Sequence, residues 1–271
     1  MSGNLEQLQE ILKETDGVLV AFSGGVDSTF LLKVAHMVLG ARAVALTTSS
    51  PTAPPGELQA AEELAETIGC RHITIPSHEL ENPSFAQNPV NRCYFCKDEL
   101  YRICRRQADQ LGVETVVDGT NLDDLKDHRP GLKAAKEWRV RHPLVEAQMR
   151  KEEIRHWSHA LALPTWDKPA IACLSSRIPY GIEINMERLE KIGACERFLQ
   201  ELQFKQFRVR YHGELVRIEV AAEEIDRLME PATREAIVRK FKEIGFTFVS
   251  LDLQGYRTGS MNEALSKRIA K

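Results

Sequence analysis

An apolar segment that runs into a short glycine-containing loop constrains the fold of this chain more than any other feature. Residues 18–22 read VLVAF and predict a buried strand, residues 23–28 read SGGVDS, and a helical pattern follows over 28–39. Glycines let a backbone approach phosphate closely, hydroxyls add donors, and free amides at a helix N-terminus carry partial positive charge. No Gly-Lys-Ser/Thr follows, so this is not a Walker loop. The segment therefore predicts a phosphate-binding strand, loop and helix; a tight turn without further function is the alternative.

The alternation of strand and helix continues to about residue 125. Further strands are predicted at 43–47, 72–75 and 115–118, and helical patterns lie between them over 57–68 and 94–111. Repeated units of this kind form a parallel sheet, whose ligands bind beyond the carboxyl ends of the strands. The glycine loop would lie at such an end.

The length of 271 residues favours one large domain and one smaller one. The pattern changes after a proline-punctuated stretch that ends near residue 181. It then predicts a helix over 186–202, strands over 207–211 and 215–221, helices over 222–244 and a strand over 246–253. We therefore predict an α/β parallel-sheet domain over residues 1–181 and a small α+β domain over 182–271 for substrate binding or oligomerisation. The long connections 49–56, 77–92 and 121–148 are expected to be functional or mobile.

Charge and apolar patterning limit the functional classes. With 36 basic and 39 acidic residues the formal net charge is -3, which argues against a dedicated nucleic-acid binder. The N-terminal pattern of Leu5, Leu8, Ile11 and Leu12 predicts an amphipathic helix, not a signal peptide. No apolar run approaches the ~20 residues that span a bilayer. We expect a cytoplasmic protein without nucleic-acid or membrane partners, whose six cysteines are reduced.

Two cysteines stand three residues apart at the start of a predicted helix. Cys93 and Cys96 would be neighbours on one helical face and could share a metal. Cys104 would lie about 12 Å further along a continuous helix and could not join them. Without a second CxxC or HxxxH, the remaining candidate partner is Cys173. Three thiolates on an iron–sulfur cluster leave one iron open to bind sulfide; two reduced core cysteines are the alternative.

Cys173 itself stands in the sequence ACLSSRIPYG, residues 172–181. The nearby positive charge of Arg177 would favour its thiolate, which suits a nucleophile or a metal ligand. The arginine fork also fits phosphate or carboxylate. An interdomain linker with a buried cysteine explains the Pro, Gly and Ser content equally well.

Together, these motifs resemble the LarE family of ATP-dependent sulfur transferases, which belongs to the PP-loop ATP pyrophosphatases. The resemblance rests on SGGVDS, GTNLDD at 119–124, DHRPG at 127–131, PAIACLSSRIPYG at 169–181 and FRVRYHG at 207–213. It extends over nearly the whole chain. The family makes the thiocarboxylates of the nickel-pincer nucleotide cofactor of lactate racemase, from pyridinium-3,5-biscarboxylic acid mononucleotide. The resemblance implies adenylylation of a carboxylate, pyrophosphate release and replacement of oxygen by sulfur, in a homo-oligomer.

The resemblance also implies roles for individual residues. ATP and Mg²⁺ would be bound by Ser23, Gly24, Gly25, Val26, Asp27 and Ser28, with the nucleotide bordered by Gly119, Thr120 and Asn121. The substrate would be bound by Ser176, Arg177, Glu196, Arg208 and Arg210. The catalytic residues would be Asp27, Cys173, Ser176 and Arg177. Strand alternation puts Arg208 and Arg210 on one side. The alternatives are a solvated strand face for these arginines and an exposed helical position for Glu196.

The chain departs from the single-cysteine pattern of the family, in which the cysteine gives up its sulfur and becomes dehydroalanine. Cys93 and Cys96 resemble the three-cysteine variants, which implies a 4Fe-4S cluster as sulfide carrier on Cys93, Cys96 and Cys173. We favour that version. The other functions considered are a PP-loop tRNA thiolase, an ammonia-dependent amide synthetase of the NAD or GMP type, and a non-enzymatic iron–sulfur or metal carrier.

Overall fold

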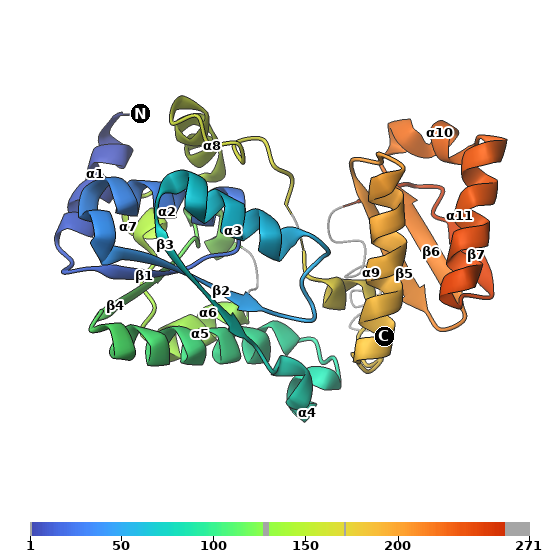
Figure 1. The fold of residues 1–271 in the computed structure, drawn as a ribbon, viewed down its shortest axis with the longest axis horizontal. Helices are drawn as coiled ribbons and strands as arrows, with labels where there is room; N and C mark the ends of the chain where they lie inside the picture. The colour runs from blue at the N-terminus through green and yellow to red at the C-terminus, as the bar shows by residue number, and fades with distance from the viewer. Residues whose placement is uncertain (1, 127–129, 171, 258–271) are drawn as a thin grey trace. The chain divides into compact units, whose positions relative to one another are not determined.

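The computed structural model describes residues 2–126, 130–170 and 172–257. The chain divides into two compact units, one of Met1–Phe85 with Val90–Ile171 and one of Ala86–Pro89 with Ala172–Lys271 (Figure 1). The division falls between residues 171 and 172, whereas the sequence placed it between 181 and 182. The reason is that Leu174, Arg177 and Ile178 are buried in the second unit.

The first unit is built on a parallel sheet of four strands, as predicted. They are β1 (Val18–Ala21), β2 (Ala43–Ser49), β3 (Arg71–Pro76) and β4 (Thr115–Asp118), in the order β3-β2-β1-β4. The chain passes from β1 through β2 to β3 on one side and returns to β4 on the other side of β1. Ligands of such sheets bind where the order reverses, beyond the carboxyl ends of β1 and β4.

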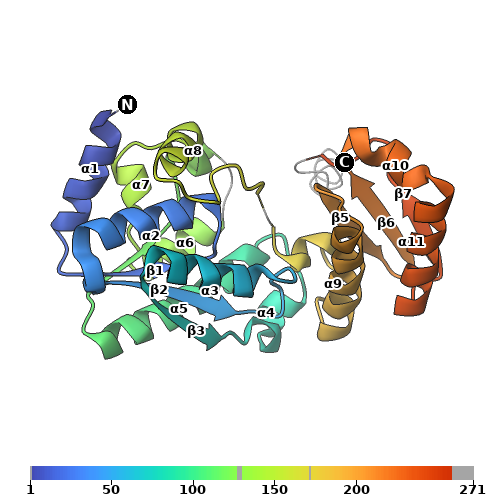
Figure 2. The ribbon, with the colours of Figure 1, turned by 45° about the horizontal axis from the view of Figure 1, so that its top comes forward.

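Helices cover both faces of this sheet (Figures 1 and 2). One face packs against α1 (Ser2–Lys13), α2 (Val26–Leu39), α3 (Glu57–Ile68) and α8 (Lys151–Ala160). The other packs against α5 (Arg92–Leu111) and α6 (Gly131–Glu137). Val18 and Val20 face the first layer, and Leu19 and Ala21 face the second. Because both faces are buried, the strand appears in the sequence as one continuous apolar run.

The long connections contain more regular structure than the sequence predicted. The short elements in them are η2 (Glu79–Glu81), α4 (Pro83–Ala86), η3 (Leu122–Lys126), α6 and α7 (Pro143–Glu146), and a further short turn, η1 (Gly40–Arg42), joins α2 to β2. Elements of one or two turns are too short to show a helical period, which is why they read as loops. Among the described residues, no helix is both long and apolar enough to cross a membrane.

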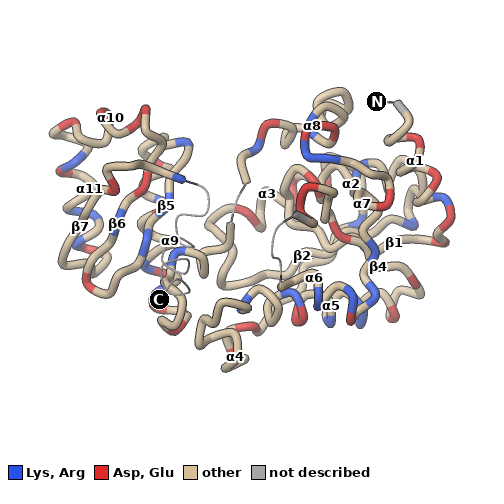
Figure 3. The backbone as a smooth tube through the Cα atoms, turned by 180° about the vertical axis from the view of Figure 1, so that it is seen from behind, with Lys and Arg blue, Asp and Glu red and all other residues tan. Residues whose placement is uncertain are grey.

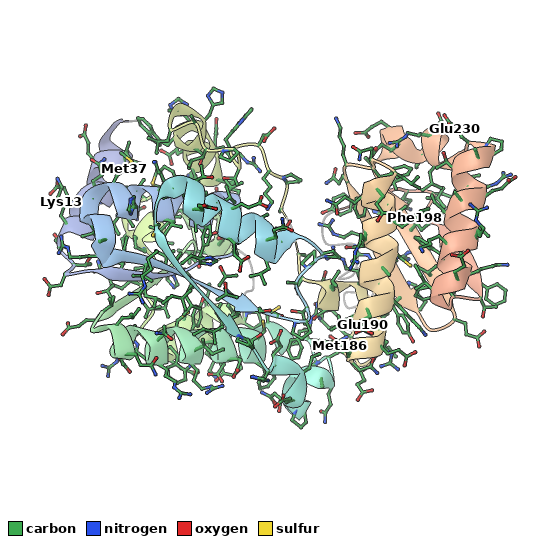
Figure 4. All side chains as sticks on the ribbon, viewed as in Figure 1. Lys13, Met37, Met186, Glu190, Phe198 and Glu230 are labelled. Carbon is green, nitrogen blue, oxygen red and sulfur yellow. The ribbon has the colours of Figure 1, made fainter. Side chains whose placement is uncertain are left out.

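The second unit is a small α+β fold, as predicted. Its sheet has the order β5-β6-β7, with β5 (Phe207–His212) antiparallel to β6 (Leu215–Val220) and β7 (Phe248–Leu251) parallel to β6. Two longer helices, α9 (Met186–Glu201) and α11 (Pro231–Ile244), pack together; Met186, Glu190 and Phe198 mark α9 in Figure 4. The predicted helical stretch 222–244 is divided into η5 (Ala222–Glu224), α10 (Ile225–Met229) and α11. Pro231 begins α11, where its fixed φ and missing N–H are tolerated.

Candidate functional site

The glycine loop joins the carboxyl end of β1 to α2. Gly24 has a φ of 68°, and a Cβ built on it would lie 3.2 Å from the Cβ of Ala61 in α3. Only glycine fits both the conformation and the space. The hydroxyls of Ser23 and Ser28 lie 3.1 Å apart, and the Ser28 hydroxyl donates to the Gly25 carbonyl at 3.3 Å. These bonds hold the loop in shape from within.

The N-terminus of α2 presents the loop's binding groups. Gly25 caps the helix without a side-chain hydrogen bond, so the first-turn amides of Val26, Asp27 and Ser28 are available to an anion. Asp27 Oδ2 accepts a 2.5 Å hydrogen bond from Lys151 Nζ. Its Oδ1 is buried and has no hydrogen-bond partner among the described residues. A buried carboxylate oxygen of this kind fits a hard cation such as Mg²⁺, which prefers oxygen ligands.

The end of β4 lies directly against this helix turn. A Cβ on Gly119 would be 2.8 Å from the Ser28 nitrogen, so only glycine allows so close an approach. Asn121 Oδ1 accepts hydrogen bonds from the amides of Asp123 and Asp124, which folds the GTNLDD motif into a compact turn. The structure therefore brings Gly119 beside the phosphate loop. Residues 127–129 of the DHRPG motif lie outside the described residues.

Two lysines that the sequence analysis did not single out also reach the loop. Asp123 accepts a hydrogen bond from the backbone N–H of Lys151 at 3.0 Å, which fixes the start of α8. Lys168 Nζ donates to the Gly24 carbonyl at 3.3 Å and to Glu57 Oε2 at 2.9 Å. Both lysines are more than a hundred residues from the loop. No local pattern could have indicated these contacts.

A buried carboxylate lies one residue before Gly119. Asp118 Oδ2 accepts from the Tyr101 hydroxyl at 2.5 Å, and Oδ1 accepts from His142 Nδ1 at 2.7 Å. Burial acts to raise the pKa of Asp118, but the His142 hydrogen bond and the charge of Lys97 outweigh it and hold this pKa well below its usual range. Asp118 is therefore a fixed negative charge at the end of β4. From the sequence, Asp118 was predicted only as the last residue of a strand, before Gly119, and its buried partners Tyr101 and His142 were not predicted.

The six cysteines fall into two groups. Cys93 is exposed and Cys96 half-buried in the first two turns of α5, and Cys173 is half-buried in the second unit, before η4 (Leu174–Arg177). The others, Cys70, Cys104 and Cys195, are buried. Burial raises the pKa of all three buried thiols, that of Cys104 to about 12. The thiols that are not buried are therefore those of the three predicted ligands, Cys93, Cys96 and Cys173. Within either unit, no group of three His, Cys, Asp or Glu side chains among the described residues is arranged to hold a metal ion.

Arg177 is bound entirely within the second unit. Its side chain is 1% exposed and donates to both carboxylate oxygens of Glu196, at 2.8 and 3.0 Å. Nη1 donates to the carbonyls of Ala172 and Cys173, at 2.7 and 3.0 Å. Glu196 is buried, so its interpretation as an exposed helical residue is wrong. The guanidinium and its partner together brace the turn that holds Cys173.

A second buried ion pair lies on the sheet of this unit. Arg210 donates to both oxygens of Glu219, at 3.0 and 2.8 Å, and to the Ser176 carbonyl at 3.0 Å. The strand register places Arg208 and Arg210 on one face with Glu219 and Arg217. Arg210 is buried, so a solvated face is the wrong interpretation for it. Burial, together with the charge of Arg177, lowers the pKa of Arg208, whose guanidinium lies 5.0 Å from the Tyr256 ring.

The charge of this cluster is unbalanced. Four guanidiniums face three carboxylates, and the arginines of β5 and β6 are among the basic residues marked in Figure 3. The members are Arg177, Arg208, Arg210 and Arg217 with Glu196, Glu219 and Asp252, which pairs with Arg217. A net positive cluster with fork-shaped donors suits phosphate or carboxylate.

A glycine loop at the switch point of a parallel sheet, with an aspartate in the first turn of the following helix, defines a PP-loop ATP pyrophosphatase. In agreement, residues 5–92 match the family model of NAD synthase. The chain is 35% identical over 257 residues to the pyridinium-3,5-bisthiocarboxylic acid mononucleotide synthase of Lactiplantibacillus plantarum, covering 94% of this chain and 92% of that protein. It therefore belongs to the family of this synthase, the LarE-type ATP-dependent sulfurtransferases.

Two other relatives fit this assignment. An uncharacterized protein of Synechocystis is 46% identical over 98% of this chain and the whole of its own length. A GMP synthase subunit of Archaeoglobus fulgidus is 23% identical over 73% of this chain and 68% of its own length.

Proposed function

We propose that this chain adenylylates a carboxylate of pyridinium-3,5-biscarboxylic acid mononucleotide with ATP and replaces one oxygen by sulfur. The observation that carries the proposal is the 35% identity to the L. plantarum synthase over almost the whole of both chains. Attack of the carboxylate on the α-phosphorus would release pyrophosphate and leave an acyl adenylate. A sulfur nucleophile would then displace AMP at the acyl carbon and leave a thiocarboxylate. Activation is needed because AMP leaves easily, whereas a carboxylate oxygen does not.

The nucleotide would occupy the crevice at the ends of β1 and β4. The first-turn amides of α2 and the hydroxyls of Ser23 and Ser28 would bind phosphate, with Gly119, Thr120 and Asn121 at the border. We propose that Asp27 holds Mg²⁺, because its buried Oδ1 has no donor among the described residues. Bound Mg²⁺ would neutralise phosphate charge as bonds to the α-phosphorus change.

The phosphate of the substrate would be bound by the arginine cluster of the second unit. Arg177 and Arg210 are each fixed by a buried carboxylate, so they position the turn around Ser176 and contribute charge. Arg208 would contact the phosphate directly, with its guanidinium steadied on the Tyr256 ring. Ser176 and Glu196 complete the proposed substrate site. The Ser176 hydroxyl donates a hydrogen bond to the Cys173 carbonyl at 2.8 Å.

We propose that Cys93, Cys96 and Cys173 hold a 4Fe-4S cluster. In support, these three are the accessible thiols, whereas Cys70, Cys104 and Cys195 are buried with raised pKa values. When bound, the cluster would supply sulfide through its one iron without a protein ligand. We further propose a homo-oligomer that works in the reducing cytoplasm, with a small-molecule substrate and no nucleic-acid partner.

The test is an anaerobic assay with ATP, Mg²⁺, sulfide and the dicarboxylate mononucleotide. We expect pyrophosphate release that depends on the mononucleotide, and a product whose mass shows oxygen exchanged for sulfur. Pyrophosphate release that depends on tRNA instead would make the chain a tRNA thiolase. An amide product formed with ammonia would indicate an amide synthetase. A protein that binds iron but releases no pyrophosphate with any of these acceptors would be a carrier.

A further inference from the structure

The short helix α6 lies against the first turns of α5, which carry Cys93 and Cys96 (Figures 1 and 2). We propose that α6 sets the geometry of this thiol pair and that Tyr94, between the two cysteines, is the positioning residue; this role rests on the proposed use of the thiols as ligands. Ligands bind one metal well only when the residues around them hold them in the required arrangement.

Tyr94 is held by two side chains of α6. Its hydroxyl donates to Glu137 Oε2 at 2.7 Å, and Lys133 Nζ lies 5.2 Å from the centre of its ring. The Glu137 hydrogen bond raises the pKa of Tyr94, so the phenol remains a donor at neutral pH. One turn further along α5, Trp138 Nε1 donates to Asp98 Oδ1 at 2.8 Å. These contacts fix how the start of α5 is rotated about its axis.

The first residue of α6 touches the same turns. A Cβ built on Gly131 would lie 2.9 Å from Lys97 Cγ and 3.7 Å from the Cys93 carbonyl oxygen. Because Cγ is near the base of its side chain, a larger residue at 131 would shift Lys97 or separate the two helices. With 3.6 residues per turn, the stripe of Tyr94 and Lys97 lies about 100° around α5 from the two cysteines. The helix α6 therefore contacts α5 beside the thiols, and Cys93 stays exposed and Cys96 half-buried.

Stability alone is the competing explanation for these contacts. The hydrogen bond between Tyr94 and Glu137 is exposed. A bond that both groups could also make to water contributes little to the free energy of folding. The buried part of the contact is apolar and includes Ala134 and Ala135, which pack in the same core cluster as Tyr101 and Cys104 of α5. The exposed bond therefore orders the turn that carries the thiols more than it stabilises the unit.

The test uses phenylarsine oxide, whose arsenic(III) forms two As–S bonds with a pair of thiols and releases its oxygen as water, without oxidation or reduction. All proteins carry Cys173→Ala, the parent variant, so that Cys93 and Cys96 are the thiols that are not buried. Competition with a small dithiol measures the binding constant. We expect Tyr94→Phe and Glu137→Ala each to weaken binding about fivefold, the factor for one lost hydrogen bond, with little change in melting temperature.

Three further variants separate positioning from stability. Glu137→Gln keeps an oxygen acceptor for the phenol and should bind the arsenical like the parent. Tyr94→Phe combined with Glu137→Ala should bind no more weakly than either single variant, because both remove the same hydrogen bond. Arg105→Met is the matched control, because Arg105 donates to the Trp138 carbonyl at 3.2 Å and so joins the same segments about 13 Å beyond Cys96. It should lower the melting temperature without changing arsenical binding.

Iron release to a chelator, measured anaerobically in chains that keep Cys173, gives a second readout and should be faster in Tyr94→Phe than in the wild type. Parent-like arsenical binding by both Tyr94→Phe and Glu137→Ala would overturn the positioning role, as would an equal loss in Arg105→Met. A wild type that holds no iron would contradict the proposed cluster, and arsenical binding would still decide whether Tyr94 positions the thiols.

Discussion

Arg177 and Glu196 form a buried two-point ion pair that connects α9 to the turn carrying Cys173. Both guanidinium-to-carboxylate distances are 3.0 Å or less, and both side chains are at most 5% exposed. Glu196 also accepts a hydrogen bond from the Val209 backbone at 3.0 Å, so β5 is tied to the same carboxylate. One charge pair therefore fixes three segments of the second unit around a thiol proposed to bind the cluster.

Breaking this pair should be costly. Arg177→Met or Glu196→Gln leaves a buried charge without its partner, and we expect either change to lower the free energy of unfolding by about 3–5 kcal/mol. Urea denaturation measures the loss, and the alkylation rate of Cys173 in native protein should rise as its turn loosens. The matched control is Arg197→Met, an exposed arginine on the same helix, which should cost no more than about 0.5 kcal/mol. Equal effects of Arg197→Met and Arg177→Met would contradict the bracing role.

Asn88 should be sensitive both to backbone and to side-chain changes. It is fully buried with a φ of 54°, and its Nδ2 donates to the carbonyls of Ile178, Pro179 and Ile182. Asn88→Gly loses the amide but accepts the positive φ, whereas Asn88→Ala loses the amide and is strained as well. We expect Ala to be less stable than Gly by about 1 kcal/mol.

Asn88→Asp tests the direction of these hydrogen bonds. It keeps the shape of the side chain but turns a donor into an anion that faces carbonyl oxygens, and should be the least stable of the three variants. The stabilities of the three variants are compared by thermal unfolding, with limited proteolysis as the probe of the unfolded fraction. Asn88→Asp as stable as Asn88→Gly would show that the amide does not donate to the three carbonyls.

The parts of the molecule that the sequence predicts are those set by local pattern. Strands β1, β2 and β4 were found because burial on both faces makes each a short apolar run, which does not hold for the partly exposed edge strand β3. Arg208 and Arg210 were placed on one face by strand alternation. Contacts between elements were not found. Lys151 meets Asp27 across 124 residues only because α8 packs on α2, and Glu219 meets Arg210 only through the register of β5 and β6. Such contacts depend on packing and register, which no local pattern contains.

The cysteines separate the two possible sulfur sources. If they hold a cluster, anaerobic protein should contain iron and acid-labile sulfide, and Cys93→Ala, Cys96→Ala and Cys173→Ala should each lose both. Cys104→Ala and Cys195→Ala are the controls, because these buried thiols should not contribute. Iron and sulfide determinations provide the measurement. If Cys93→Ala and Cys96→Ala keep full single-turnover activity while the protein becomes lighter by one hydrogen sulfide, Cys173 itself is the sulfur donor.

Asp118 should make stability depend on pH in the acid range. Burial acts to raise its pKa, but the hydrogen bond from His142 and the charge of Lys97 outweigh burial, so the folded pKa lies below the ordinary value of about 3.9. The stabilisation is therefore complete above that value and is lost as the pH falls below it toward the folded pKa. Asp118→Asn lacks this charge and should be less stable than the wild type by about 3 kcal/mol at pH 7.

The difference between these two proteins should shrink steadily once the pH falls below about 4, as the unfolded wild type takes up the proton first. Urea unfolding of both proteins at a series of pH values measures it. Tyr101→Phe is the matched control: it removes one hydrogen bond to Asp118, at a cost of about 1–3 kcal/mol, but keeps the carboxylate and hence most of the pH dependence. A stability difference between Asp118→Asn and the wild type that stays constant down to the acid limit of folding would mean that Asp118 is not held ionised by its neighbours.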